Sequence, residues 1–78
     1  MKNSGREEEV IVHPVGGMQL SEGYIRENGS QRFVGSLPGI APLVGDTLEE
    51  VLMRLDRMAK AYYGDDVVVE LASGMAAA

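Results

Sequence analysis

The sequence contains no cysteine. Disulfide bonds and thiolate metal sites are therefore excluded as sources of stability. At 78 residues the chain has room for one domain, and a core of that size gives only marginal stability by itself. We therefore expect a partner, either a second copy of the chain or another protein, to contribute. The absence of cysteine also fits a reducing cytoplasm.

Basic residues are few: seven Lys and Arg stand against twelve Asp and Glu, for a net charge of −5. Binding of nucleic acid by counterion release requires clustered basic side chains, whereas Arg54, Arg57 and Lys60 alternate with acidic residues. We expect no direct contact with nucleic acid. Acidity favours a basic protein partner through electrostatic complementarity, and it also serves solubility.

Long hydrophobic runs are missing as well. The uninterrupted apolar runs cover only a few residues, far fewer than a membrane span requires. The first nine residues contain no apolar segment of the kind found in a secretory signal. We expect a cytoplasmic protein with no membrane partner.

The chain divides into two tails and one domain. Residues 1–8 are polar and predict a flexible acidic tail, residues 9–72 form a single α+β domain, and residues 73–78 predict a flexible C-terminal tail. The acidic run at 7–9 either mimics phosphate groups toward a nucleic-acid-binding partner or keeps the terminus solvated, and its composition favours the second.

Extended segments are predicted at 10–13, where the residues are β-branched, and at 18–27. The Asn-Gly pair that follows is typical of a two-residue hairpin turn, because both residues tolerate a positive φ. Such a turn pairs Tyr24 with Phe33 on one side of the hairpin. It leaves Ile25 and Val34 on the other side, away from the helix.

One long amphipathic helix follows. Thr47 is the predicted N-cap, with Glu50 three residues later as the second half of a capping box, and Gly64 ends the helix. The predicted apolar stripe consists of Leu48, Val51, Leu52, Leu55, Met58, Ala59 and Tyr62. The predicted ion pairs on the wet side are Glu50 with Arg54 and Asp56 with Lys60.

A turn at 65–66 leads to a last strand at 67–71, whose Val67, Val69 and Leu71 share the face beneath the helix. The predicted fold is a small α+β domain: a β-β-β-α-β sheet with one helix packed on one face and residues 10–13 as an additional N-terminal strand.

The order of these signals resembles the HicB antitoxin family over residues 18–72. The resemblance is carried by the hairpin at 24–34, the Leu-Pro-Gly turn at 37–39, the Gly-Asp-Thr-Leu-Glu-Glu helix start at 45–50 and the final strand. It implies a truncated ribonuclease-H-like fold without nuclease activity, which neutralises a small basic RNA-cleaving toxin by covering its surface and oligomerises through this domain. The DNA-binding domain of full-length family members is missing, so we expect a stand-alone domain.

No enzyme activity, cofactor or metal is expected. His13 is the sole histidine; a general base is one interpretation, and an ordinary histidine at a strand end is the favoured one. Asp65, Asp66 and Glu70 suggest the carboxylates of a two-metal nuclease, but a polar turn followed by a solvent-facing strand position explains them better.

The predicted partner surface is the sheet face that the helix leaves bare. Its candidate residues are Glu22, Ile25, Glu27, Val34, Val68 and Glu70. We expect a homodimer, since one helix covers only one face. Pro38 and Pro42 discourage pairing along their own segment, so a terminal strand is the predicted edge for a second copy.

Two functions remain open beside an enzyme, which has no positive support. The first is a HicB-like protein-binding module that neutralises a basic toxin. The alternative is a small acidic inhibitor of the phage type that blocks a nucleic-acid-binding protein complex.

Overall fold

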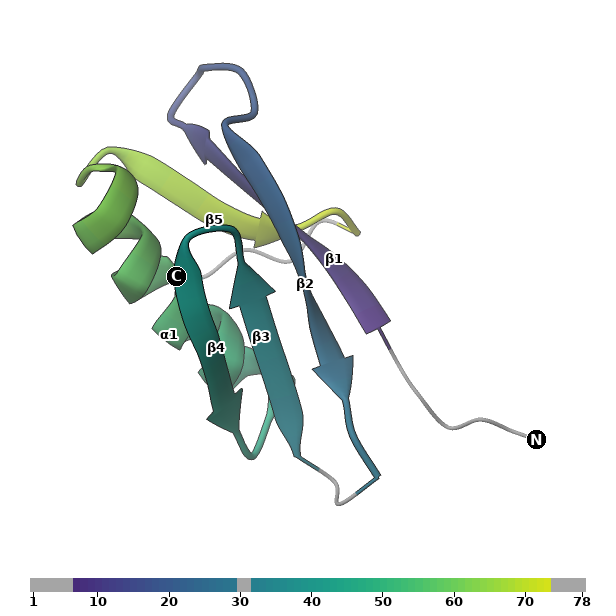
Figure 1. The fold of residues 1–78 in the computed structure, drawn as a ribbon. Helices are drawn as coiled ribbons and strands as arrows, with labels where there is room; N and C mark the ends of the chain where they lie inside the picture. The colour runs from purple at the N-terminus through teal and green to yellow at the C-terminus, as the bar shows by residue number, and fades with distance from the viewer. Residues whose placement is uncertain (1–6, 30–31, 74–78) are drawn as a thin grey trace.

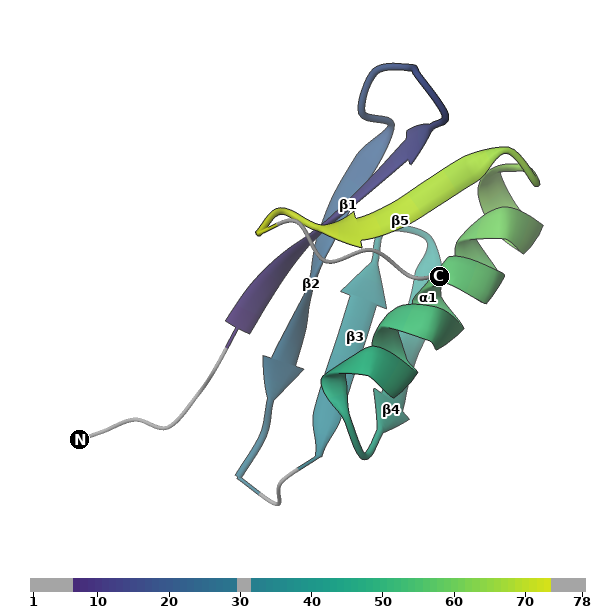
Figure 2. The ribbon, with the colours of Figure 1, turned by 180° about the vertical axis from the view of Figure 1, so that it is seen from behind.

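The domain is one five-stranded sheet with a helix on one face (Figures 1 and 2). The computed structural model describes residues 7–29 and 32–73. The elements are β1 (Glu7–Pro14), β2 (Ser21–Glu27), β3 (Phe33–Leu37), β4 (Ile40–Gly45), α1 (Leu48–Tyr63) and β5 (Val67–Leu71). The strand order is β4-β3-β2-β1-β5, and all neighbours are antiparallel. The predicted α+β fold is confirmed, with the additional N-terminal strand lying between β2 and β5.

Strand β1 is longer than the sequence pattern suggested. It begins at Glu7, which pairs with Arg26, and continues through Glu8, which pairs with Ile25. These two residues therefore belong to the sheet and not to the tail predicted for residues 1–8. Residues 1–6 and 74–78 lie outside the described residues.

The predicted hairpin register is wrong. The Asn28 N–H donates to the Arg32 carbonyl at 2.9 Å, so the connection is longer than two residues, and Gly29 does not adopt a positive φ. Phe33 pairs with Glu27 instead of Tyr24, a shift of three residues along β2. Because side chains alternate between faces, an odd shift turns one strand over relative to the other.

The core lies between α1 and the covered face of the sheet. Its buried residues are Val10, Val12, Ile25, Leu37, Ile40, Val51, Leu52, Leu55, Ala59, Val67, Val69 and Leu71, each at most 8% exposed. The placement of Val67, Val69 and Leu71 beneath the helix is thus confirmed. Burial of these aliphatic side chains is the main term that stabilises the fold.

The apolar stripe of α1 is narrower than predicted. Met58 and Tyr62 are 43% and 60% exposed, so their assignment to the buried stripe is wrong. The buried line follows Leu55, Ala59 and Tyr63 at i,i+4 spacing, with Tyr63 packed against the core. The last turn of the helix lies against the β3–β4 turn, and Tyr62 is beside Gly39 at the edge of the core.

The Leu-Pro-Gly turn is held by the end of α1. Gly39 has a φ of +83°, and a Cβ added there would lie 2.6 Å from the Tyr62 hydroxyl oxygen. The Tyr63 hydroxyl donates to the Pro38 carbonyl at 3.0 Å. The turn therefore depends on a residue without a side chain at position 39.

We expect Gly39→Ala to lower the free energy of unfolding by about 1–2 kcal/mol, because alanine at positive φ is strained and the Tyr62 ring must move. Gly29→Ala is the matched control, since it has no neighbouring atom within 4 Å and no positive φ. Chemical denaturation measures both; equal effects of the two substitutions would contradict this account of the turn.

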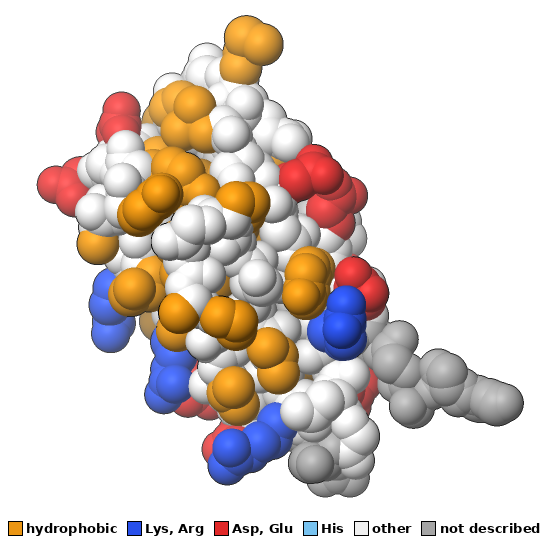
Figure 3. Space-filling model, in the orientation of Figure 1, with side chains coloured by type: hydrophobic (Ala, Val, Ile, Leu, Met, Phe, Trp, Pro, Cys, Tyr) orange, Lys and Arg blue, Asp and Glu red, His pale blue; other side chains and the backbone are white. Residues whose placement is uncertain are grey.

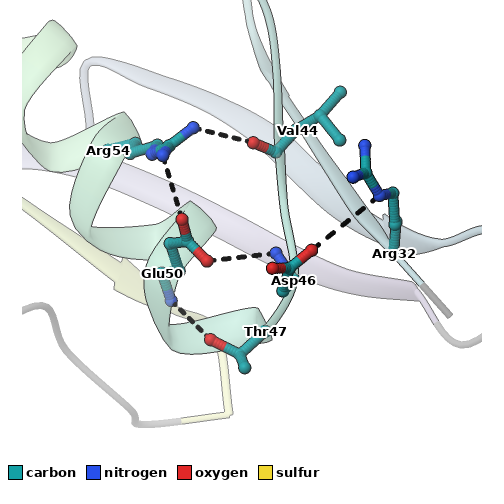
Figure 4. Close-up of polar contacts among 6 residues, drawn as sticks. All are labelled: Arg32, Val44, Asp46, Thr47, Glu50 and Arg54. Atoms are coloured by element: carbon teal, nitrogen blue, oxygen red, sulfur yellow. Dashed lines mark hydrogen bonds and ion pairs between the residues drawn. The ribbon is translucent and has the colours of Figure 1, made fainter.

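The start of α1 is fixed by the predicted cap (Figure 4). The Thr47 Oγ1 accepts from the Glu50 N–H at 3.0 Å, and the Glu50 carboxylate accepts from the Asp46 N–H at 3.1 Å. Glu50 also pairs with Arg54 at 2.9 Å. The capping residue is confirmed, although the carboxylate reaches one residue further back than a capping box requires.

The remaining helix predictions are confirmed. Lys60 Nζ lies 2.6 Å from the Asp56 carboxylate, and the Gly64 N–H donates to the Lys60 carbonyl at 3.1 Å with a φ of 130°. The chain then turns at Asp65 and Asp66 into β5.

Removal of the Thr47 hydroxyl should destabilise the domain. Thr47→Ala leaves the Glu50 N–H without its side-chain acceptor, so we expect a loss of roughly 1 kcal/mol. Thr47→Ser retains the oxygen and should restore most of it. A denaturation midpoint that does not move in the alanine variant would show that the cap contributes nothing.

Candidate functional site: the open face of the sheet

Helix α1 lies behind the sheet in Figure 1 and leaves the opposite face uncovered. We call this uncovered side the open face. Its residues alternate along each strand with the buried ones. They are Glu7, Glu9, Ile11 and His13 of β1; Glu22, Tyr24 and Arg26 of β2; Val34 and Ser36 of β3; Val44 of β4; and Val68 and Glu70 of β5.

Apolar side chains lie together on the β3–β4 side of this surface. Val34 lies opposite Val44 on neighbouring strands, and Val44 is 41% exposed. Arg26 is the cross-strand neighbour of Val34 on β2; its guanidinium lies 4.8 Å from the centroid of the Tyr24 ring and 3.7 Å from the Glu7 carboxylate. Figure 3 shows hydrophobic side chains over the centre of this side, with acidic groups on its upper flanks.

The β1–β2 loop extends the apolar surface beyond the sheet (Figure 1). It carries the three most exposed large hydrophobic side chains of the described residues after Tyr62 is set aside: Val15, Met18 and Leu20 are 76%, 86% and 55% exposed. The loop is anchored by the Val15 N–H, which donates to the Asp66 carbonyl at 3.2 Å. Several exposed apolar side chains in one short loop are typical of contact surfaces.

Carboxylates line the β1–β2 side of the open face. An open groove of about 510 Å³ is bounded by Glu7, Glu9, Glu22, Gly23 and Tyr24. Arg26 partly compensates Glu7, and Gln19 donates to Glu22 at 2.9 Å. The groove therefore offers negative charge beside an aromatic ring, an arrangement that suits a basic side chain.

His13 and Glu70 meet on the same face. The His13 Nε2 lies 2.5 Å from the Glu70 carboxylate, and its Nδ1 lies 2.9 Å from the Pro14 carbonyl. The hydrogen bond to Glu70, and secondarily the one to the Pro14 carbonyl, raise the pKa of His13 above its usual 6.5. The two residues are diagonal neighbours across β1 and β5, a pairing that no local sequence signal reveals.

The His13 contact gives the fold a defined pH dependence. Because the pKa is higher in the folded chain, the ion pair contributes fully below about pH 6.5 and is lost as the pH rises through the folded-state value. We expect NMR titration to place the His13 pKa above 6.5. Glu70→Gln should lower it toward that value and reduce the fall in unfolding free energy on the alkaline side; an unchanged titration curve in the variant would contradict the pairing.

The structure separates the predicted partner residues into two groups. Glu22, Val34, Val68 and Glu70 lie on the open face. Ile25 is 1% exposed beneath α1, and Glu27 shares its face; their placement on the uncovered side is wrong because of the hairpin register. Sequence reasoning missed Tyr24 and Val44, whose faces only the true register reveals.

The carboxylates of Asp65, Asp66 and Glu70 do not form a metal site in the described residues. Within residues 7–29 and 32–73, no three His, Asp or Glu side chains lie close enough together to hold a metal ion. Glu70 binds His13 instead, and Asp65 and Asp66 form the turn before β5.

Comparison with protein-family models, with curated proteins and with solved structures gave no match to this chain. In the described part of the chain, the helix is neither long nor apolar enough to cross a membrane.

Proposed function

We propose that this chain is a non-catalytic protein-binding module that resembles a HicB antitoxin and neutralises a basic RNA-cleaving toxin by covering its surface. One observation carries the proposal. A single helix covers one face of the sheet, and the opposite face presents apolar side chains bordered by carboxylates.

The composition of the open face supports protein recognition. Val34 and Val44 supply apolar area on β3 and β4, Tyr24 adds an aromatic ring on β2, and Glu9 and Glu22 supply charge beside them. Protein interfaces likewise combine apolar area with a polar border. The chain thus presents apolar area and negative charge together on a rigid, hydrogen-bonded sheet.

The charge balance supports a basic partner. At the β3–β4 end of the sheet, Arg32 lies 3.8 Å from Asp46, and on α1 Arg54 pairs with Glu50, so these arginines are matched by acids. Within the described residues, Glu9 and Glu22 have no basic partner. Unmatched negative charge therefore lies on the β1–β2 side of the open face, where it complements a nucleic-acid-binding surface.

Where the gene beside this one encodes a small basic protein, that protein is the probe, with RNA cleavage and binding as readouts, and the absence of such a gene counts against the toxin. Wild type should bind it and suppress cleavage. Glu9→Lys with Glu22→Lys should raise the dissociation constant by about tenfold or more. Glu27→Lys with Glu49→Lys makes the same change in net charge away from the open face and should have little effect.

Equal loss of binding in the two double variants would reduce the effect to net charge and contradict a localised surface. Full cleavage in the presence of wild type would exclude the toxin and favour the alternative partner, a nucleic-acid-binding protein complex blocked by the same acidic face.

A further inference from the structure

The two edges of the sheet differ in how they are protected. The Asn28 bond to Arg32 fixes which pairs of residues on β2 and β3 are hydrogen-bonded. The alternation of an antiparallel ladder then turns Val44 of β4 outward, and Pro42 lies in the register shift opposite Gly35 to Leu37. Pro42 has no N–H to offer. The Arg54 guanidinium donates to the Val44 carbonyl at 2.9 Å, so the β4 edge is blocked at both positions.

Strand β5 has no such protection beyond its first residue, where the Val67 N–H donates to the Gly64 carbonyl at 3.4 Å. The Ala72 N–H donates to the Glu9 carbonyl at 2.8 Å, and the Asp66 carbonyl accepts from Val15 at 3.2 Å. The same alternation turns Val68 and Glu70 toward β1, and it turns the backbone of the intervening residues Val67, Val69 and Leu71 outward. In the described part of the chain, no backbone hydrogen bond reaches the outward groups of Val69 or Leu71.

The side chains of β5 also favour strand addition. The sequence Val-Val-Val-Glu-Leu has high β-propensity and contains neither proline nor lysine. Its one charged residue, Glu70, is engaged by His13. An exposed edge of this kind is a template for another strand.

We propose that β5 pairs with β5 of a second copy, antiparallel and about a two-fold axis at Val69. This register places Val69 opposite its own counterpart and Val67 opposite Leu71. In this register all three outward-facing residues lie opposite one another, with Val67 accepting through its carbonyl while its N–H stays on Gly64. The register is self-complementary, as a two-fold interface requires. The self-pairing favours a second copy over an unrelated strand.

In this arrangement Val68 lies opposite Glu70 of the second copy, and no like charges are directly opposed. The two Glu70 carboxylates become diagonal neighbours, and the His13 on each copy offsets their charge. Both helices fall on the same side, so the two open faces form one continuous surface. This contact between β5 edges does not depend on the identity of any toxin.

Amide hydrogen exchange of the wild-type protein tests the pairing residue by residue. The Val68 and Glu70 amides bond to β1 within one copy and should be protected at every concentration. The Val69 and Leu71 amides should become protected only as the protein concentration rises, in step with a doubling of the 8.4 kDa mass in light scattering. Val69 and Leu71 amides that exchange freely in a dimeric sample would overturn the proposal.

A matched pair of substitutions tests the register. Val68→Glu places like charges opposite each other at two equivalent positions and should raise the dimer dissociation constant by about tenfold. Val68→Lys places an ammonium opposite Glu70 and should leave the dimer intact. Circular dichroism checks folding, and misfolding is not expected in the glutamate variant because His13 lies beside position 68.

Each other outcome counts against the pairing. Equal dissociation of both variants would indicate that the open faces, not the edges, meet. A dimer unaffected by either variant would place the contact elsewhere. A wild-type protein that remains monomeric at millimolar concentration would leave the β5 edge to a strand from a different protein.

Discussion

The structure depends on the burial of one face of the sheet beneath α1. All five strands contribute aliphatic side chains to that face, among them Val10, Ile25 and Val69, and the helix contributes Leu52 and Leu55. A domain with no cysteine and a single helix has no other large source of stability. The same constraint leaves the opposite face in water, so the open face is a direct consequence of how the fold is stabilised.

The local elements could be predicted because their signals lie close together in the sequence. Each of these features depends on residues only a few positions apart. They are the cap at Thr47, the two ion pairs of α1, the helix end at Gly64 and the strand at 67–71. The packing of Tyr62 and Tyr63 on the Pro38–Gly39 turn could not be found in this way, because it joins residues more than twenty positions apart.

The errors arose where non-local pairing decides the outcome. An Asn-Gly pair predicts a two-residue turn, but the register that buries Ile25 requires a longer connection, and the burial of a core side chain outweighs a turn preference. The contact of His13 with Glu70 depends on β1 lying beside β5, which the sequence order does not reveal. The face predicted for Val34 and Val68 was therefore right, and the face predicted for Ile25 was wrong.

Both proposed contacts use the sheet. Its face carries the acidic and apolar groups of the proposed toxin contact, while its β5 edge carries the unblocked backbone groups of the proposed self-association. Arg54 stabilises the first turn of α1 through its ion pair with Glu50. The same side chain blocks the β4 edge by donating to the Val44 carbonyl.

The most direct test of the central claim is methyl relaxation of the protein in the presence of a soluble paramagnetic agent, which reports the distance of each methyl group from solvent. The account predicts strong relaxation enhancement for Val34 and Val44 and almost none for Ile25 and Leu52. Strong enhancement at Ile25 with protection of Val34 would mean that the opposite face is covered, and would contradict the register on which the whole account depends.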